Sequence, residues 1–106
     1  MIVTTSHTIP EKRIVKTIGL VKGNTIRARH IGKDIVAVFK NIVGGEILEY
    51  TKLMAESREQ ALDRMVEDAK SQGANAIIGV YITTSMISQG AAEIMAYGTG
   101  VQVEEA

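Results

Sequence analysis

The two histidines are the side chains of this chain best suited to hold a soft metal ion. His7 lies in an expected turn beside Ser6, and His30 lies where an expected strand meets an expected helix. Soft ions prefer thiolate, thioether and imidazole ligands, and the chain has no cysteine. The histidines form no His-x₃-His pair, so a solvated or hydrogen-bonded role is the simpler interpretation of each. We therefore predict at most a weakly bound divalent metal, with His7 and His30 as its candidates.

The five methionines raise the possibility of a copper(I) site built from thioethers. Met54 and Met65 fall on the apolar stripe of an expected helix. Met86 and Met95 fall on strands that flank an expected hairpin, where they could face each other. Thioethers in apolar stripes usually fill a core, and this interpretation is favoured for these residues.

Arg58 is the residue that could bind an anionic ligand. It falls on the apolar stripe of the same helix, one turn after Met54 and just before Ala61. A buried guanidinium needs a partner, which is either an anion in a crevice between copies or a carboxylate or carbonyl at a subunit interface. The interface is favoured, because structural ion pairs commonly occupy such positions. Tyr50, two turns earlier on the same side, carries the same two interpretations.

A cluster of basic residues precedes the first expected helix: Arg27, Arg29, His30 and Lys33. Cations beside a helix N-terminus can hold a phosphate. No glycine-rich phosphate loop accompanies them, so a solvated sheet edge is the favoured interpretation.

The sequence contains no recognisable catalytic set. It has no cysteine, no Ser-His-Asp arrangement and no paired acids in a known motif. We therefore predict that the chain is not an enzyme.

These side chains depend on elements that the hydrophobic pattern predicts in the order strand, strand, helix, helix, strand, strand. The expected strands span residues 2–5, 14–26, 74–87 and 93–103, and the expected helices span residues 31–42 and 46–72. Gly44 and Gly45 should end the first helix, and Gly73 should end the second. The fold class is therefore α+β, with a largely antiparallel sheet packed on a long helix.

The last strand alternates a bulky row and a small row of residues. Ala96, Gly98 and Gly100 form the small row, which we expect to admit the long helix closely, with Ala61 and Ala69 as contacts. The bulky row contains Met95, Tyr97, Thr99, Val101 and Val103. Because the helices can cover only one face, we expect the bulky row to be buried against another copy of the chain. The alternative is a harmless exposed apolar face.

Composition limits the class of protein further. A chain of 106 residues is one domain, residues 1–106, and 12 basic residues balance 12 acidic ones. This balance argues against nucleic acid as a partner, because phosphate binding needs clustered cations. No signal peptide and no apolar run of ~20 residues is present, so we expect a cytoplasmic protein with no membrane partner.

Several stretches resemble the YbjQ-like family, whose description is "putative heavy-metal-binding". They are IVGG with Gly44 and Gly45, Tyr50, SREQA with Arg58, GANAIIGV with Gly73, and YGTGV with Tyr97, Gly98 and Gly100. The resemblance implies a strand-strand-helix-helix-strand-strand fold and a homo-oligomeric ring of five copies. Neither His7 nor His30 belongs to these stretches.

Two functions remain after this comparison of residue patterns. The first is a small-ligand or metal-ion binding module that forms a homo-oligomeric ring and lacks catalytic activity. The second is a structural or partner-interaction ring with no small ligand.

Overall fold

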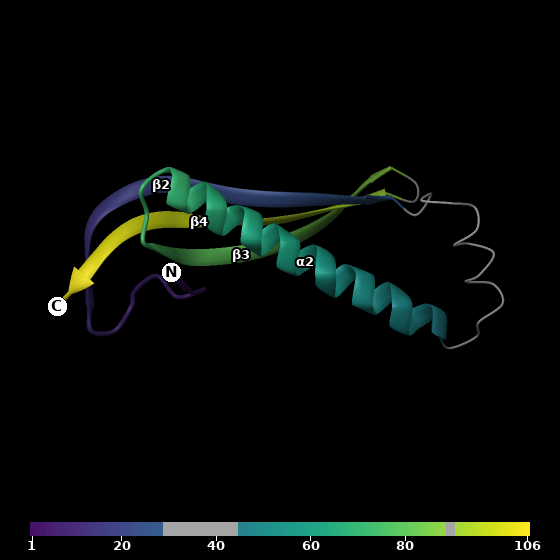
Figure 1. Ribbon diagram of the computed structural model, residues 1–106, viewed down its shortest axis with the longest axis horizontal. Coiled ribbons are helices and arrows are strands. Elements are labelled where there is room, and N and C mark those ends of the chain that lie inside the picture. The colour runs from purple at the N-terminus through teal and green to yellow at the C-terminus, as the bar shows by residue number, and fades with distance from the viewer. Residues whose placement is uncertain (29–44, 89–90) are drawn as a thin grey trace.

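The computed structural model describes residues 1–28, 45–88 and 91–106, and the side chains of residues 1–26, 52–87 and 91–106. In chain order its elements are β1 (Ile2–Val3), β2 (Lys12–Ala28), α2 (Gly45–Ser71), β3 (Ala76–Ser88) and β4 (Ala91–Glu105). They form a four-stranded sheet in the order β1-β3-β4-β2, and α2 lies across one face of it (Figure 1). This confirms the α+β class. The expected helix at residues 31–42 and the expected stop at Gly44 lie outside the described residues.

The sheet is mixed, although most of its pairing is antiparallel as predicted. β4 lies in the centre and pairs antiparallel with both β2 and β3. β1 pairs parallel with the start of β3, where Ile2 faces Ala76 and Val3 faces Ile77. The first strand is therefore a short edge strand.

Helix α2 ends where the sequence predicted. Gly73 has a φ of 91°, which is a left-handed conformation that glycine adopts without steric cost. The Gly73 N–H donates to the Lys70 carbonyl at 3.1 Å, and the Ala74 N–H donates to the Ala69 carbonyl at 3.0 Å. These two bonds form a Schellman motif, which satisfies carbonyls that the helix end leaves free. Ala69 and Ala74 are both buried, so the motif directs the chain into β3.

The main core lies between α2 and the sheet. Its buried members include Val21 of β2, Ala61 and Met65 of α2, and Ile77 and Ile94 of the two central strands. These residues belong to strands with a two-residue period and to a helix with a 3.6-residue period, so one face of each element is apolar. Burial of this apolar surface is the main stabilisation of the fold.

The closest approach of the helix to the sheet is at Gly23 of β2, not at the small row of β4. A Cβ at Gly23 would overlap the Met65 nitrogen and the Ala61 carbonyl oxygen, and it would lie 2.7 Å from the Arg64 carbonyl carbon. Ala61 is thus a contact as predicted, but its partner strand is β2. The prediction of the partner strand was wrong because the C-terminal part of α2 lies against β2 (Figure 1).

The small row of β4 makes room for neighbouring strands. A Cβ at Gly98 would lie 2.9 Å from Ile77 Cγ2 and 3.0 Å from the Ile78 carbonyl oxygen. The register of β3 shifts between Ile78 and Tyr81, where Gly79 has a φ of 60°. This bulge directs β3 toward Gly98, so glycine is needed there for a reason other than the helix.

A second, smaller core lies on the opposite face of the sheet. Val101 is 1% exposed and packs with Ala76 and Ile78, while Ile9 and Val103 cover them. The N-terminal segment is held there because the Gly79 N–H donates to the Ser6 carbonyl at 2.9 Å. The expectation that Val101 is buried against another copy is therefore wrong, because its own chain covers it.

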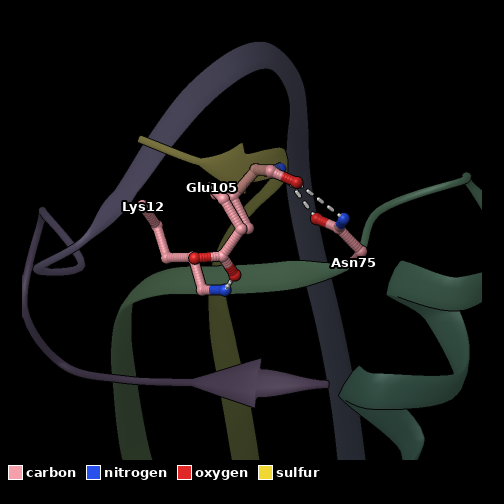
Figure 2. Close-up of polar contacts among 4 residues, drawn as sticks. Lys12, Asn75 and Glu105 are labelled. Atoms are coloured by element: carbon pink, nitrogen blue, oxygen red, sulfur yellow. Dashed lines mark hydrogen bonds and ion pairs between the residues drawn. The ribbon is translucent and has the colours of Figure 1, made fainter.

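Side-chain contacts hold the end of the sheet beside this second core. The Asn75 side chain donates to the Val103 carbonyl at 3.0 Å and accepts from the Val103 N–H at 2.8 Å (Figure 2). Lys12 forms an ion pair with Glu105, and these two residues lie on paired strands (Figure 2). Asn75 thus continues the hydrogen bonding of β4 before β3 begins.

Candidate functional site

The candidate site is the part of the sheet face that neither α2 nor the N-terminal segment covers. We call it the open face, and its members are Leu20, Lys22, Asn24, Ile26, Tyr81, Thr83, Ser85, Glu93, Met95, Tyr97 and Thr99. Strand alternation places them opposite the buried Val21, Gly23 and Thr25 of β2. Leu20 is 63% exposed and Tyr81 is 56% exposed. The open face is therefore a large, partly apolar surface.

Two tyrosines form the centre of the open face. The rings of Tyr81 and Tyr97 stack with centroids 6.0 Å apart and planes at 25°. Register places Lys22 beside Tyr97 on the next strand. Offset aromatic pairs of this kind stabilise a sheet and offer flat apolar area to a partner. Tyr97 thus remains a candidate for binding or for an interface, as predicted from the sequence.

The open face also carries polar groups. The Asn24 side-chain amide donates to the Glu93 carboxylate at 3.3 Å, and the backbone carbonyl of Asn24 accepts from Arg64 at 2.6 Å. Protein interfaces commonly combine apolar contacts with hydrogen-bonding groups. The open face therefore suits docking better than acid–base chemistry.

Arg58 does not lie on the buried side of α2. The buried positions of this part of the helix are Ser57, Ala61, Met65 and Ala69, each four residues after the last. Arg58 is one position away from this row and is exposed. The prediction of a buried arginine was wrong because an apolar stripe with gaps allows either residue 57 or residue 58 to face the core. An interface or ligand role for Arg58 stays a prediction.

Ser57 occupies the buried position instead. Its hydroxyl donates to the Leu53 carbonyl at 2.8 Å, and its own carbonyl accepts from the Thr25 hydroxyl at 3.3 Å. These bonds satisfy two buried hydroxyls and join α2 to β2.

Several predicted candidates fall outside the described side chains. Tyr50 lies within α2, and Gly45 is the first residue of that helix, but the Tyr50 side chain is not described. His30 and most of the basic cluster lie in the undescribed stretch 29–44, and the side chain of Arg27 is likewise not described. Their proposed roles stay predictions.

His7 lies in the N-terminal segment against the bulge of β3. A Cβ at Gly79 would be 3.1 Å from both Cε1 and Nδ1 of the His7 ring, and the ring is exposed. Within residues 1–26, 52–87 and 91–106, no group of three His, Cys, Asp or Glu side chains could hold a metal ion. The residues of this described part thus do not fit a preorganised metal site in one copy.

Sequence reasoning missed several residues that hold the sheet and the helix in place around the site. Gly23 is a glycine inside a strand pattern, which is a signal of close backbone approach. Asn75 follows a helix stop and precedes an apolar strand, so its polar side chain was a signal of a backbone bond. The contacts of Arg64 and Asp68 with β2 left no such signal, because both residues look like ordinary charges on a solvated helix.

No helix among the described residues is long and apolar enough to cross a membrane.

Comparison with known proteins places these features in a wider group. The family model described as "putative heavy-metal-binding", YbjQ, matches residues 1–104. A UPF0145 protein from Dehalococcoides mccartyi is 58% identical over 104 residues, which cover 98% of this chain and 100% of that protein. A UPF0145 protein from Methanosarcina acetivorans is 52% identical over 103 residues, covering 97% of each chain.

A solved structure has the same fold. The crystal structure of a DUF74-family protein of unknown function from Pediococcus pentosaceus matches with a TM-score of 0.65. The two chains are 16% identical, and the match covers 98% of each. The likeness therefore concerns the fold alone.

Proposed function

The chain belongs to the YbjQ family, and from this premise we propose that it is a non-catalytic binding module that works as a closed homo-oligomeric ring. In this proposal the open face of one copy is covered by the next copy. A small ligand or a metal ion binds in the crevices between copies. The resemblance drawn from the sequence suggests five copies.

The observation that supports this proposal is the apolar character of the open face. Leu20, Ile26 and Tyr81 are all exposed on it. Monomeric proteins seldom leave contiguous apolar patches larger than a few hundred Å² exposed, and larger patches usually mark interaction sites. A heterologous contact, in which different surfaces of the two copies meet, must close into a ring or it grows into a fibre.

The ligand site of such a ring would need more than one copy, or residues outside the described part. Family membership suggests a metal ion, but the described side chains of one copy form no metal-binding group. Imidazoles from several copies could converge at a ring axis, with His7 and His30 as the candidates. A small organic ligand against the tyrosine pair fits the same crevices.

Native mass spectrometry of protein purified without added metal tests the proposal. We expect a closed oligomer of defined copy number with additional mass from a retained ligand or metal. A ring without retained mass would favour the second candidate, a ring that serves structure or partner binding. A monomer at micromolar concentration would overturn both.

A substitution on the open face tests where the copies meet. Leu20→Lys places a charge in each contact, at a cost on the order of several kcal/mol per buried ion. We expect the ring to dissociate, as measured by light scattering. Glu67→Lys, at an exposed position on α2, is the control and should leave the copy number unchanged. A Leu20→Lys ring as stable as the wild type would place the contact elsewhere.

A further inference from the structure

Among the described residues, the outer edge of β3 is paired only at its start. There β1 faces Ala76 and Ile77, and the Val80 N–H donates to the Thr4 carbonyl at 3.1 Å. From Tyr81 onward, β3 pairs with β4 alone among the described residues. The side chains of residues 81–87 are all exposed. This stretch, which we call the open edge, is therefore accessible on both faces and along its outer side.

Backbone groups of the open edge point away from the sheet in a defined pattern. The Lys22 N–H bonds to Asp68, so Lys22 directs its backbone groups away from β4. Lys22 is paired with Tyr97, so the backbone groups of Tyr97 point away from β2 and toward β3. Tyr97 is paired with Tyr81 on β3, and these two residues therefore form a hydrogen-bonded pair. The backbone N–H and C=O groups of the next residue of β3, and of every second residue after it, then point outward, away from β4. These residues are Ile82, Thr84 and Met86.

The composition of the open edge favours strand pairing. Residues 81–87 read YITTSMI and contain no charge, no proline and no glycine. Natural proteins usually protect exposed edge strands with lysine, proline or a covering element. An uncharged stretch of high β-propensity at an edge pairs readily with another strand. The open edge has no lysine and no proline, and no element within residues 1–28, 45–88 and 91–106 covers it, so it should have a partner.

The opposite edge of the sheet is protected. The Lys22 N–H of β2 donates to the Asp68 carboxylate at 2.9 Å, and the Asn24 carbonyl accepts from Arg64 at 2.6 Å. Two charged side chains of α2 therefore occupy the backbone groups that a further strand would need. The contrast indicates that sheet extension occurs at β3 rather than at this part of β2.

The open edge is complementary to itself in antiparallel orientation. An alignment centred on Thr84 sets Tyr81 opposite Ile87, Ile82 opposite Met86, and Thr83 opposite Ser85. Apolar residues then meet apolar ones, and hydroxyl residues meet at the centre. We propose that the open edges of two copies pair antiparallel about a two-fold axis at Thr84, which joins two sheets into one continuous sheet.

This contact goes beyond the proposed ring, because it uses a strand edge rather than the open face. A two-fold contact joins copies in pairs. Combined with a ring of five, it would join two rings into an assembly of ten copies. The two proposals therefore predict different masses and can fail separately.

A cysteine cross-link tests the pairing, since the chain has no cysteine of its own. Residues that face each other on hydrogen-bonded strands have Cα atoms about 5.5 Å apart, within the range of a disulfide. We expect Thr84→Cys to form a covalent dimer on mild oxidation. Glu67→Cys, on the exposed side of α2, is the control. Cross-linking of Thr84→Cys no greater than that of Glu67→Cys would overturn the pairing.

A mixed experiment tests the register. Ile82→Cys and Met86→Cys should each form little disulfide-linked dimer when oxidised alone. A mixture of the two should form disulfides between unlike chains. Equal cross-linking of each variant with itself would contradict the Thr84 axis.

Two measurements on the unmodified protein complete the test. Hydrogen exchange should show the amides of Ile82, Thr84 and Met86 as strongly protected as their neighbours in the β3–β4 ladder, and fast exchange would overturn the pairing. Native mass spectrometry then separates the proposals. Ten copies support both, five support the ring and overturn the edge pairing, two support the edge pairing and overturn the ring, and one overturns both.

Discussion

The two halves of the sheet have similar apolar sequences and opposite surroundings. In the half that includes Val21 and Val101, which we call the covered half, α2 packs on one face and the N-terminal segment packs on the other. In the half that includes residues 81–87, which we call the open half, these side chains of β3 are exposed on both faces, although Ile94 and Ala96 of the neighbouring β4 are buried. An apolar strand pattern therefore predicts that a strand is buried, but it does not identify the helix, segment or second copy that covers it.

The dimensions of the chain agree with this division. Its radius of gyration is 17.4 Å and its principal extents are 57 × 23 × 17 Å. A compact domain of about 100 residues has a radius of gyration of about 13 Å. Figure 1 shows that the N-terminal half of α2 and the far ends of the strands diverge from each other. The outer strand of the open half is therefore left uncovered by α2, and another copy can reach it.

The largest effect is expected from Gly23→Ala in the covered half. The added methyl group would overlap backbone atoms of Ala61 and Met65. Helix backbone atoms cannot relieve such an overlap by changing rotamer, as a side chain can. We expect a loss of about 3 kcal/mol or more in the free energy of unfolding, as measured by chemical denaturation. Lys22→Ala, at the exposed neighbouring position, should change it by less than about 0.5 kcal/mol. A stable Gly23→Ala protein would mean that α2 packs elsewhere.

Gly98→Val should have the next largest effect. Its side chain would meet Ile77, Val80 and the Ile78 carbonyl, all of which lie in β3. We expect a loss of ~1–3 kcal/mol, because the side chains can adjust in part. Chemical denaturation measures it, and an unchanged midpoint would show that Gly98 is not enclosed. A smaller loss of unfolding free energy for Gly98→Val than for Gly23→Ala would show that overlap with side chains costs less than overlap with backbone.

Glu11→Gly should stabilise the turn that leads into the covered half. Glu11 has a φ of 67°, a conformation that costs a non-glycine residue roughly 1–2 kcal/mol. Glycine removes this cost, but part of the gain is lost because glycine has more conformational entropy in the unfolded chain. We expect a net gain of about 0.5–1 kcal/mol in thermal or chemical denaturation. Glu11→Ala retains the unfavourable conformation and should give no gain. A loss on Glu11→Gly would mean that the glutamate side chain stabilises the turn.

The smallest effect is expected from added metal. The one described histidine, His7, lies against Gly79 with no group of metal ligands around it. We expect Zn²⁺, Cu²⁺ or Ni²⁺ to bind weakly and through histidine, so micromolar metal should raise the stability by no more than a few tenths of a kcal/mol. Calorimetry measures the affinity. A tight site that survives His7→Ala combined with His30→Ala would contradict this ranking of ligands.

Local elements followed from the sequence because short-range physics determines them. The long helix was predicted at residues 46–72 and spans Gly45–Ser71. The strand predicted at residues 14–26 spans Lys12–Ala28, since alternation of side chains is a local property. The helix ends at Gly73 through two bonds within a few residues, from the Gly73 N–H to Lys70 and from the Ala74 N–H to Ala69.

The tertiary structure decided which side of each element meets which neighbour. The sequence allowed residue 57 or residue 58 to face the core, and the angle at which α2 crosses β2 selected Ser57. It also allowed glycines of either strand to admit the helix, and the same crossing selected Gly23 over Gly98. The cover of Val101 depends on Ile9, ninety-two residues away in the chain. Such contacts join segments whose separation in sequence carries no periodic signal, so only the folded chain determines them.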